Sequence, residues 1–260
     1  MKIAVSGKGG VGKTTLSAFM IKAFSDRGHK VLAIDADPDA NLAGALGFEH
    51  SETILPISEM KDLIGERTES QPGSFGTFFK LNPQVSDLPE KLSKQKGNVR
   101  LMVMGGVKKG GGGCICPESV MLKTLITHLI LARDEVVVLD MEAGIEHLGR
   151  GTASAVNKLI VVVEPGKRSI ETARHIQELA HDIGLKNIAL VGNKIRGDQD
   201  KAFLQKQLQG FHFLGFLPYD RQVIEADLEG KAPFEKEQGL SVQVGRIVDD
   251  LIAENVSNAQ

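Results

Sequence analysis

The sequence predicts an α/β protein with one doubly wound, mostly parallel sheet flanked by helices, and three observations carry this prediction. Apolar, β-branched runs recur along the chain and are nearly unbroken, as in strands that are buried on both faces of a sheet. Segments with apolar residues at helical spacing separate these runs. A glycine-rich loop follows the first run and precedes a helical pattern. Alternating strands and helices place a ligand at the carboxyl ends of the strands.

The runs that predict strands are spread over most of the chain. They occupy residues 3–5, 31–34, 99–103, 136–139, 159–163, 188–191 and 213–217. Residues 16–27 are predicted to form the first helix, and apolar stripes predict two further helices over 121–130 and 170–183.

The stretch from about residue 50 to residue 98 breaks this alternation with scattered prolines, glycines and charges. We predict an irregular insertion here with short helices, one of them over 57–66, inside a single domain that spans residues 1–260. The insertion either has no function of its own on the surface or forms a docking surface for a partner, and both alternatives stay open.

Composition excludes several classes of protein. The net charge of −2 gives no reason to expect a nucleic-acid or anionic-membrane surface, and one Tyr with no Trp offers few platforms for stacked bases. The first strand follows Met1 directly, which argues against a signal peptide, and no apolar stretch approaches the roughly 18–20 residues of a membrane span. We expect a cytoplasmic protein that binds neither nucleic acid nor membrane, with both cysteines reduced.

A phosphate-binding loop lies between the first strand and the first helix. It reads Gly-Lys-Gly-Gly-Val-Gly-Lys-Thr-Thr over residues 7–15. Glycines let backbone N–H groups converge on an anionic oxygen, and the helix N-terminus adds favourable partial charge. Lys13 is predicted to reach the β- and γ-phosphates, and the Thr14 hydroxyl is predicted to ligate Mg²⁺. The predicted nucleotide contacts in the loop are Gly9, Gly10, Val11, Gly12, Lys13, Thr14 and Thr15.

Lys8 is one lysine more than such a loop needs. It lies too early to repeat the role of Lys13, so its ammonium must have another target. The alternative is a glycine-rich turn with two solvated lysines. Spacing, residue types and the strand–helix context all favour the phosphate site.

Acidic residues follow two of the predicted strands. Asp37 is expected to orient or deprotonate the attacking water, because Pro38 fixes the chain just after it. The run at 136–139 ends in Asp140, which is expected to hold Mg²⁺ directly or through water. Gly144 follows and can bring a backbone N–H close to the γ-phosphate. The alternative for residues 35–41 is an acidic strand-to-helix turn with caps.

Two later strand ends suggest a base pocket. Asn193 follows the run at 188–191, and its amide can both accept from and donate to an adenine edge. Pro218 and Tyr219 follow the last run and are predicted to wall the base. An asparagine at a strand end is often only a cap or turn residue, so that alternative stays open.

The loop with its additional lysine resembles the deviant Walker A loop of the family that contains the nitrogenase iron protein, the arsenite-pump ATPase, and the MinD and partition ATPases. The similarity runs through nearly the whole chain, including Asp37, Asp140, Asn193 and Pro218. It implies a P-loop ATPase that binds ATP or ADP with Mg²⁺. In that family the extra lysine reaches the nucleotide of the other subunit. The resemblance therefore implies that Lys8 acts catalytically across a homodimer that ATP closes.

Both cysteines lie in one lysine- and glycine-rich segment. Pro117 suits the first position of the helix that follows, which places Cys116 at or next to its N-cap. The positive helix end, with Lys108 and Lys109 nearby, is expected to lower the thiol pKa values and to favour the thiolates that metals bind. Cys114 and Cys116 from each chain of a symmetric dimer would give four sulfurs around one Zn²⁺ or Ni²⁺ ion. The alternatives are two unrelated small residues or a strained redox pair.

This cysteine pair and the segment Asp-Met-Glu-Ala-Gly-Ile-Glu-His-Leu over residues 140–148 resemble one subfamily. It consists of the CooC-type accessory ATPases for nickel insertion into carbon monoxide dehydrogenase and of the similar maturation factor of acetyl-CoA synthase. The resemblance implies a metal-binding dimer that uses ATP to help nickel enter the metal cluster of a nickel–iron–sulfur client enzyme. Glu142 departs from the wider pattern, since many relatives carry proline there, and its role stays open.

Two other functions fit parts of the sequence. A membrane-associated partition or division-site ATPase would carry a basic amphipathic C-terminal helix, whereas residues 242–254 place Asp249, Asp250 and Glu254 on the polar side. An iron–sulfur electron-transfer protein would hold a cluster with the same four sulfurs.

Overall fold

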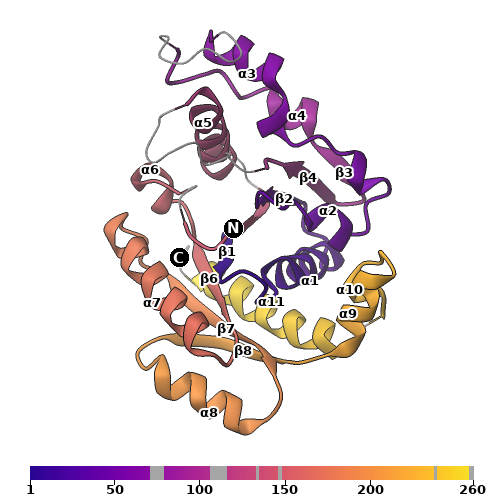
Figure 1. Cartoon of the computed structure of the whole chain (residues 1–260), viewed down its shortest axis with the longest axis vertical. Helices are drawn as coiled ribbons and strands as arrows, with labels where there is room; N and C mark the ends of the chain where they lie inside the picture. The colour runs from indigo at the N-terminus through magenta and orange to yellow at the C-terminus, as the bar shows by residue number, and fades with distance from the viewer. Residues whose placement is uncertain (71–78, 106–115, 133–134, 146–147, 237–238, 258–260) are drawn as a thin grey trace.

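The described strands form one sheet in the order β3-β4-β2-β5-β1-β6-β7-β8, in which every neighbouring pair is parallel except β3 with β4 (Figure 1). The computed structural model describes residues 1–70, 79–105, 116–132, 135–145, 148–236 and 239–257. The strands are β1 Lys2–Gly7, β2 Val31–Ala36, β3 Lys94–Lys96, β4 Val99–Val103, β5 Val136–Met141, β6 Lys158–Val163, β7 Ile188–Ile195 and β8 His212–Pro218. All the runs that predicted strands are confirmed; β4 has the predicted bounds, and the other six strands are longer than their apolar runs by one to four residues.

Strand β1 shows why these runs are unbroken. Ile3 and Val5 pack into a core on one face of the sheet, and Ala4 packs into a second core on the other face. All three side chains are buried. A strand covered on both faces has no position that water can reach, so it carries no polar alternation.

Helices cover both faces. On one face, α1 (Lys13–Asp26) packs lengthwise against α11 (Gly239–Ser257), and the two lie side by side in Figure 1. On the other face, α5 (Pro117–Ala132) and α7 (Lys167–Asp182) bury the apolar stripes that predicted them. The remaining helices are α2 Leu42–Ala45, α3 Lys61–Thr68, α4 Leu88–Leu92, α6 Arg150–Ala153, α8 Asp198–Gln207, α9 Arg221–Leu228 and α10 Pro233–Lys236.

The insertion forms short elements that pack on the main core. The predicted helix over 57–66 is observed as the 3₁₀ turn η2 (Ile57–Glu59), followed by α3. A second 3₁₀ turn, η1 (Ser51–Thr53), precedes it. Ile57 and Ile64 are buried in the same core as α5, which ties the insertion to that face of the sheet. The short strand β3 in this region was not predicted.

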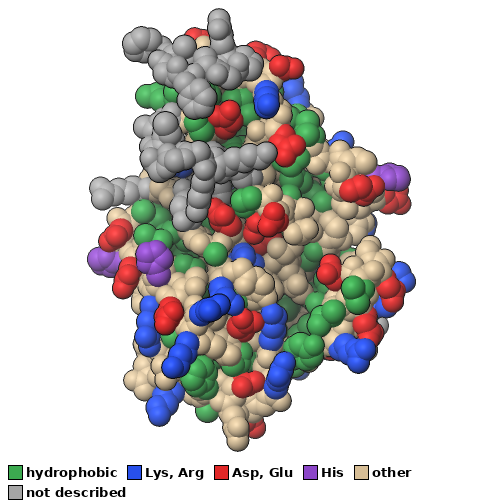
Figure 2. Space-filling model, in the orientation of Figure 1, with side chains coloured by type: hydrophobic (Ala, Val, Ile, Leu, Met, Phe, Trp, Pro, Cys, Tyr) green, Lys and Arg blue, Asp and Glu red, His purple; other side chains and the backbone are tan. Residues whose placement is uncertain are grey.

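The C-terminal helix α11 is an integral part of the fold. Its apolar residues Leu240, Val244 and Ile247 are buried in the core with α1. Its acidic residues Asp249 and Glu254 pair with Arg27 and Lys158. In the part of the chain that the structure describes, no helix has the length and apolar character that a membrane crossing needs. Figure 2 shows basic and acidic side chains interspersed on the face drawn there, as the small net charge predicts.

Candidate functional site

The phosphate loop connects the carboxyl end of β1 to the amino end of α1, as predicted. Gly12 is the N-cap of α1 and has a φ of 96°, in the left-handed region that favours glycine. A Cβ at this position would clash with the side-chain amide nitrogen of Asn193. Gly10 also has a positive φ, of 75°. The loop therefore needs glycine for its backbone shape and, at Gly12, for its close packing.

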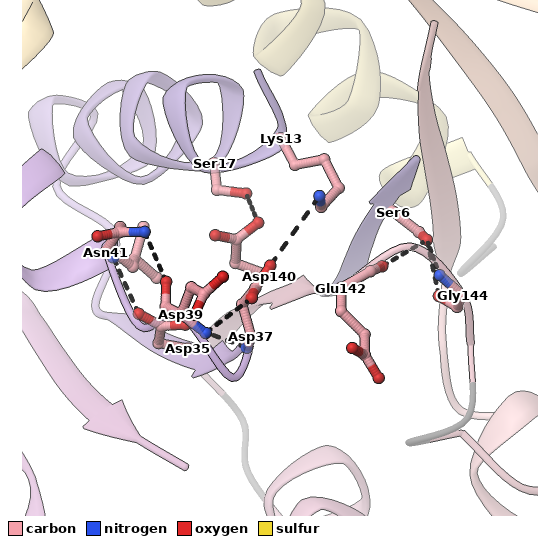
Figure 3. A network of polar contacts seen from close by, with 11 residues as sticks. Ser6, Lys13, Ser17, Asp35, Asp37, Asp39, Asn41, Asp140, Glu142 and Gly144 are labelled. Atoms are coloured by element: carbon pink, nitrogen blue, oxygen red, sulfur yellow. Dashed lines mark hydrogen bonds and ion pairs between the residues drawn. The ribbon is translucent and has the colours of Figure 1, made fainter. Parts of the chain in front are cut away.

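Lys13 and Asp37 come together at the mouth of the loop. The Lys13 side chain is only 7% exposed, and its Nζ lies 4.0 Å from Asp37 Oδ2 (Figure 3). Asp37 Oδ1 accepts a hydrogen bond from the backbone N–H of Asp39 at 3.0 Å. A buried ammonium in this position is placed to neutralise phosphate charge, and Asp37 lies beside it.

Asp140 is buried at the end of β5. Its Oδ1 accepts a hydrogen bond from Ser17 Oγ at 3.1 Å, and its Oδ2 is buried with no hydrogen-bond partner among the described residues. Burial raises the pKa of Asp140 to about 6, although the hydroxyls of Thr14 and Ser17 and the charge of Lys13 oppose the rise. An orphaned carboxylate oxygen beside the Thr14 hydroxyl fits the sparse protein ligand set that Mg²⁺ takes next to a phosphate.

Asp35 lies next to Asp140, because β2 and β5 pair these two residues in register. The carboxylate of Asp35 accepts hydrogen bonds from the backbone N–H groups of Leu42, at 2.9 Å, and Asp37, at 3.2 Å (Figure 3). Burial, together with the charge of Asp140, raises the pKa of Asp35 to about 7. Asp35 thus supports the turn that carries Asp37. The predicted alternative, an acidic turn with caps, describes Asp35 well.

Lys8 has a partner in its own chain. Its Nζ lies 3.2 Å from Oε1 of Glu164, which follows the end of β6. The other oxygen, Oε2, lies 3.1 Å from Lys194 Nζ, which also donates a hydrogen bond to the Gly10 carbonyl at 2.5 Å. The sequence predicted that Lys8 has a target other than that of Lys13, but it did not predict Glu164 or Lys194.

Ser6 ties the end of β1 to the segment that follows β5. Its Oγ donates to the carbonyl of Gly144 at 2.7 Å and also lies 3.1 Å from the carbonyl oxygen of Glu142 (Figure 3). The Gly144 N–H, predicted to approach the γ-phosphate, donates to the Glu142 carbonyl at 2.8 Å and to Ser6 Oγ at 3.3 Å. The approach of Gly144 to a phosphate stays a prediction.

Asn193 and Pro218 lie at the carboxyl ends of the neighbouring strands β7 and β8. The Asn193 amide nitrogen donates to the Val11 carbonyl at 2.7 Å, so this side chain braces the phosphate loop. Pro218 is exposed beside Tyr219, whose ring lies 5.2 Å from the guanidinium of Arg196. The two strand ends are thus neighbours, as a base pocket needs, whereas the contact of Asn193 with adenine stays a prediction.

Cys116 lies at the start of α5, as predicted. Its Sγ accepts a hydrogen bond from the Ser119 backbone N–H at 3.4 Å, which makes it the N-cap that Pro117 implied. The prediction of a lowered thiol pKa is wrong for this residue, because burial raises the pKa of Cys116 and the neighbouring carboxylate of Glu118 adds to the rise. Cys114, Lys108 and Lys109 lie outside the described residues. Within the described ranges, no three His, Cys, Asp or Glu side chains gather into a metal-binding group.

Three polar residues that the sequence did not predict make hydrogen bonds or ion pairs with other residues of the site. Ser17 supports Asp140, Ser6 orders the segment after β5, and Glu164 pairs with both Lys8 and Lys194. One signal was available, because Glu164 ends an apolar strand in the same way as Asp140 does.

Comparisons with known proteins identify the family of the chain. The family model described as the CobQ/CobB/MinD/ParA nucleotide-binding domain matches residues 2–234. The carbon monoxide dehydrogenase accessory protein CooC of Rhodospirillum rubrum is 46% identical over 237 residues, which cover 90% of each chain. An ATP-binding protein of Methanocaldococcus jannaschii is 46% identical over 255 residues, which cover 97% of this chain and 98% of the relative.

Solved structures match the fold over nearly the whole chain. MinD in the MinC:MinD cell division complex of Aquifex aeolicus gives a TM-score of 0.69 at 21% identity, with 97% of this chain and 96% of that chain covered. MinD of Pyrococcus horikoshii, complexed with Mg-ADP, gives a TM-score of 0.67 at 20% identity, with 96% and 95% covered. The predicted fold class, an α/β protein with a mostly parallel sheet flanked by helices, is confirmed.

Proposed function

Because the chain belongs to the CobQ/CobB/MinD/ParA family of nucleotide-binding P-loop ATPases and to the relatives of CooC within it, we propose that it is a dimerising metallochaperone. It uses ATP hydrolysis to assist nickel insertion into the metal cluster of carbon monoxide dehydrogenase or acetyl-CoA synthase. The observation that carries this proposal is the 46% identity to CooC over 90% of both chains.

The phosphate loop binds the nucleotide in this proposal. Backbone N–H groups of residues 9–15 surround the phosphates, Lys13 neutralises their charge, and the strand ends at Asn193 and Pro218 receive the base. Thr14 and Asp140 would hold Mg²⁺, whose chemistry is to offset the charge that builds up on the phosphate oxygens. Asp37 orients the attacking water in this proposal. Its Oδ2 lies 4.0 Å from the ammonium of Lys13, the residue that would contact the γ-phosphate, so the carboxylate lies close to where the water would attack.

Lys8 links nucleotide binding to assembly. The proposal places it across a homodimer, against the nucleotide of the partner subunit. Because ATP carries a γ-phosphate that ADP lacks, a contact there distinguishes the two nucleotides and biases the dimer between closed and open states. The Lys8 side chain is 34% exposed in this structure, which supports access by a second chain.

The cysteine segment carries the cargo in this proposal. Cys114 and Cys116 from two chains give four sulfur ligands, which suit Zn²⁺ or Ni²⁺. Burial raises the pKa of Cys116, so this thiol is protonated at neutral pH without a metal. Metal binding then releases a proton, and metal affinity falls as pH falls. Nickel is the cargo, and zinc competes for the same sulfurs.

The direct test is ATP-dependent activation of nickel-free client enzymes. Nickel-free carbon monoxide dehydrogenase and acetyl-CoA synthase are each incubated with nickel, ATP and this protein. We expect faster activation of one of them with wild type and no acceleration with Cys116→Ser or Lys8→Ala. Lys158→Ala is the matched control, because Lys158 is also paired with a glutamate but lies at the start of β6. No acceleration of either client by wild type would contradict the proposal. Iron–sulfur absorption bands in anaerobically purified protein would favour the electron-transfer alternative.

A further inference from the structure

Glu164 lies between two lysines of the nucleotide site. Its Oε1 is 3.2 Å from Lys8 Nζ, and its Oε2 is 3.1 Å from Lys194 Nζ. The three residues come from the ends of the adjacent strands β1, β6 and β7, so the order of the sheet brings them together. One carboxylate therefore pairs with two ammonium groups beside the phosphate loop, and the cluster keeps one net positive charge.

The backbone around Lys194 is distorted in a way that places its side chain over the loop. Lys194 has a φ of 57°, which non-glycine residues rarely adopt, and the pairing of β7 with β8 shifts register between Gly192 and Ile195. From this bulge, Lys194 Nζ reaches the Gly10 carbonyl at 2.5 Å. Strain of this kind persists where the surrounding structure fixes it, and it is common at functional sites.

Glu164 is itself fixed in place. Its backbone N–H donates to Ser169 Oγ at 3.0 Å, and the Ser169 side chain is buried at the start of α7. The Glu164 side chain is 24% exposed. Burial raises its pKa, but the ammonium groups of Lys194 and Lys8 outweigh that effect and hold the pKa below its ordinary value. The carboxylate is therefore ionised at neutral pH, ready to hold both lysines.

We propose that Glu164 is a positioning residue that holds Lys8 against its own subunit and releases it to the nucleotide of the partner subunit when the dimer closes. The inference rests on the proposed function, since it assumes that Lys8 acts across the dimer. Lys194 remains anchored to the Gly10 carbonyl, so Glu164 keeps one partner after Lys8 leaves.

This arrangement makes dimer closure a competition for Lys8. In the open state, the Glu164 carboxylate satisfies the Lys8 ammonium. In the closed state, phosphate oxygens of the partner's nucleotide replace the Glu164 carboxylate as the partner of Lys8. ATP is the stronger competitor, because its γ-phosphate adds negative charge that ADP lacks. Removing the carboxylate removes the competitor, so closure with ATP becomes easier.

Chemical labelling of lysine amines tests the holding contact without any nucleotide. Wild type, Glu164→Gln and Glu254→Gln are treated briefly with acetic anhydride, and the acetylation rate at each lysine is read by mass spectrometry. We expect Lys8 and Lys194 to react about fivefold faster in Glu164→Gln, because an ion pair of this exposure protects by up to that factor. Glu254→Gln is the matched control, since it should accelerate only Lys158, whose Nζ lies 2.7 Å from Glu254 Oε2. An unchanged Lys8 rate in Glu164→Gln, with Lys158 accelerated in the control, would overturn the proposal.

The second measurement tests the release. With a non-hydrolysable ATP analogue, we expect Glu164→Gln to dimerise at an about 25-fold lower protein concentration than wild type, because closure releases one Lys8 in each of the two subunits. The gain should vanish in the Lys8→Ala background, and ADP should produce no gain. A gain that persists without Lys8 would overturn the proposal. A wild type that stays monomeric with the analogue would contradict the proposed function, and the labelling result would still judge the contact itself.

Discussion

The two ends of the parallel strands carry their charges in opposite ways. At the amino end, charges form simple partly exposed pairs, such as Lys158 with Glu254 and Arg27 with Asp249, both at 2.7 Å. At the carboxyl end, Asp35 and Asp140 are fully buried side by side, and Asp140 Oδ2 has no hydrogen-bond partner among the described residues. The two ends therefore differ in whether the fold gives these carboxylates a cation as partner. Even Glu135, whose Oε2 also lacks a hydrogen bond, pairs with Arg100 at the amino end.

The difference shows what each end contributes. Pairs like those at the amino end stabilise the fold modestly and ask for no ligand. Buried carboxylates with raised pKa values cost folding free energy, and such groups persist where a ligand or a reaction uses them. Substitutions at the amino end should therefore affect stability alone, whereas substitutions at the carboxyl end should affect function while stability holds or rises.

The largest expected effect comes from Asp140→Asn. Loss of the carboxylate that would hold Mg²⁺ should lower ATP turnover by about a thousandfold. Stability of the nucleotide-free protein should stay the same or rise, because a buried charge is removed and an amide oxygen still accepts from Ser17. Turnover assays and thermal melts of the same preparation check both halves. A clear loss of stability would show that the Asp140 carboxylate stabilises the fold and would contradict the functional role of the carboxyl end.

Gly12→Ala should have the next largest effect. The new Cβ adds strain at a φ of 96° and meets the Asn193 amide, so we expect nucleotide affinity to fall about a hundredfold. Gly184→Ala is the control, since Gly184 has a φ of 81° but open space around its Cβ position. Calorimetric titration with ADP should show normal affinity for the control. Equal affinity in both variants would show that the close packing of the loop does not matter.

The buried carboxyl end should also make stability depend on pH. Burial raises the pKa of Asp35 to about 7, so this group binds a proton more readily in the folded state than in the unfolded state. Its contribution is fully present below the unfolded pKa of about 3.9 and is lost as pH rises through 7. Between pH 5.5 and 7.5, the nucleotide-free protein should lose on the order of 2 kcal/mol of unfolding free energy. Denaturant unfolding should show this loss in wild type and a much smaller one in Asp35→Asn. If the unfolding free energy falls equally with pH in wild type and Asp35→Asn, the pH dependence comes from groups other than Asp35.

Glu254→Gln should have the smallest effect. The Lys158–Glu254 pair is partly exposed, with side chains 17% and 40% accessible, so its loss should lower the unfolding free energy by about 1 kcal/mol or less. ADP affinity and ATP turnover should be those of wild type. A change in either would mean that the amino end also serves the site.

Apolar periodicity predicted most of the fold, and local motifs predicted the phosphate loop, Asp37 and Asp140. The strand β3 was not predicted, because its residues Lys94, Gln95 and Lys96 are all exposed and show no hydrophobic periodicity. The bulge at Lys194 could not be predicted either, since it is defined only by the pairing of β7 with β8.

The pairing of Lys8 with Glu164 could not be predicted because it depends on strand order. These residues lie 156 positions apart, and only the neighbouring places of β1 and β6 in the sheet join them. The pKa of Cys116 was mispredicted for a related reason. A helix N-terminus and nearby lysines are visible in a sequence, whereas burial of the thiol, which dominates its pKa, is not.

Whether two chains share one metal site is decided by the metal content and oligomeric state of the protein with a non-hydrolysable ATP analogue. Native mass spectrometry of wild type and Cys114→Ser, each loaded with nickel or zinc, gives both values together. We expect a wild-type dimer with about one metal ion per two chains, and a Cys114→Ser protein that binds nucleotide but not metal. Unchanged metal binding in Cys114→Ser, or one ion on each monomer, would contradict a metal site built from two chains.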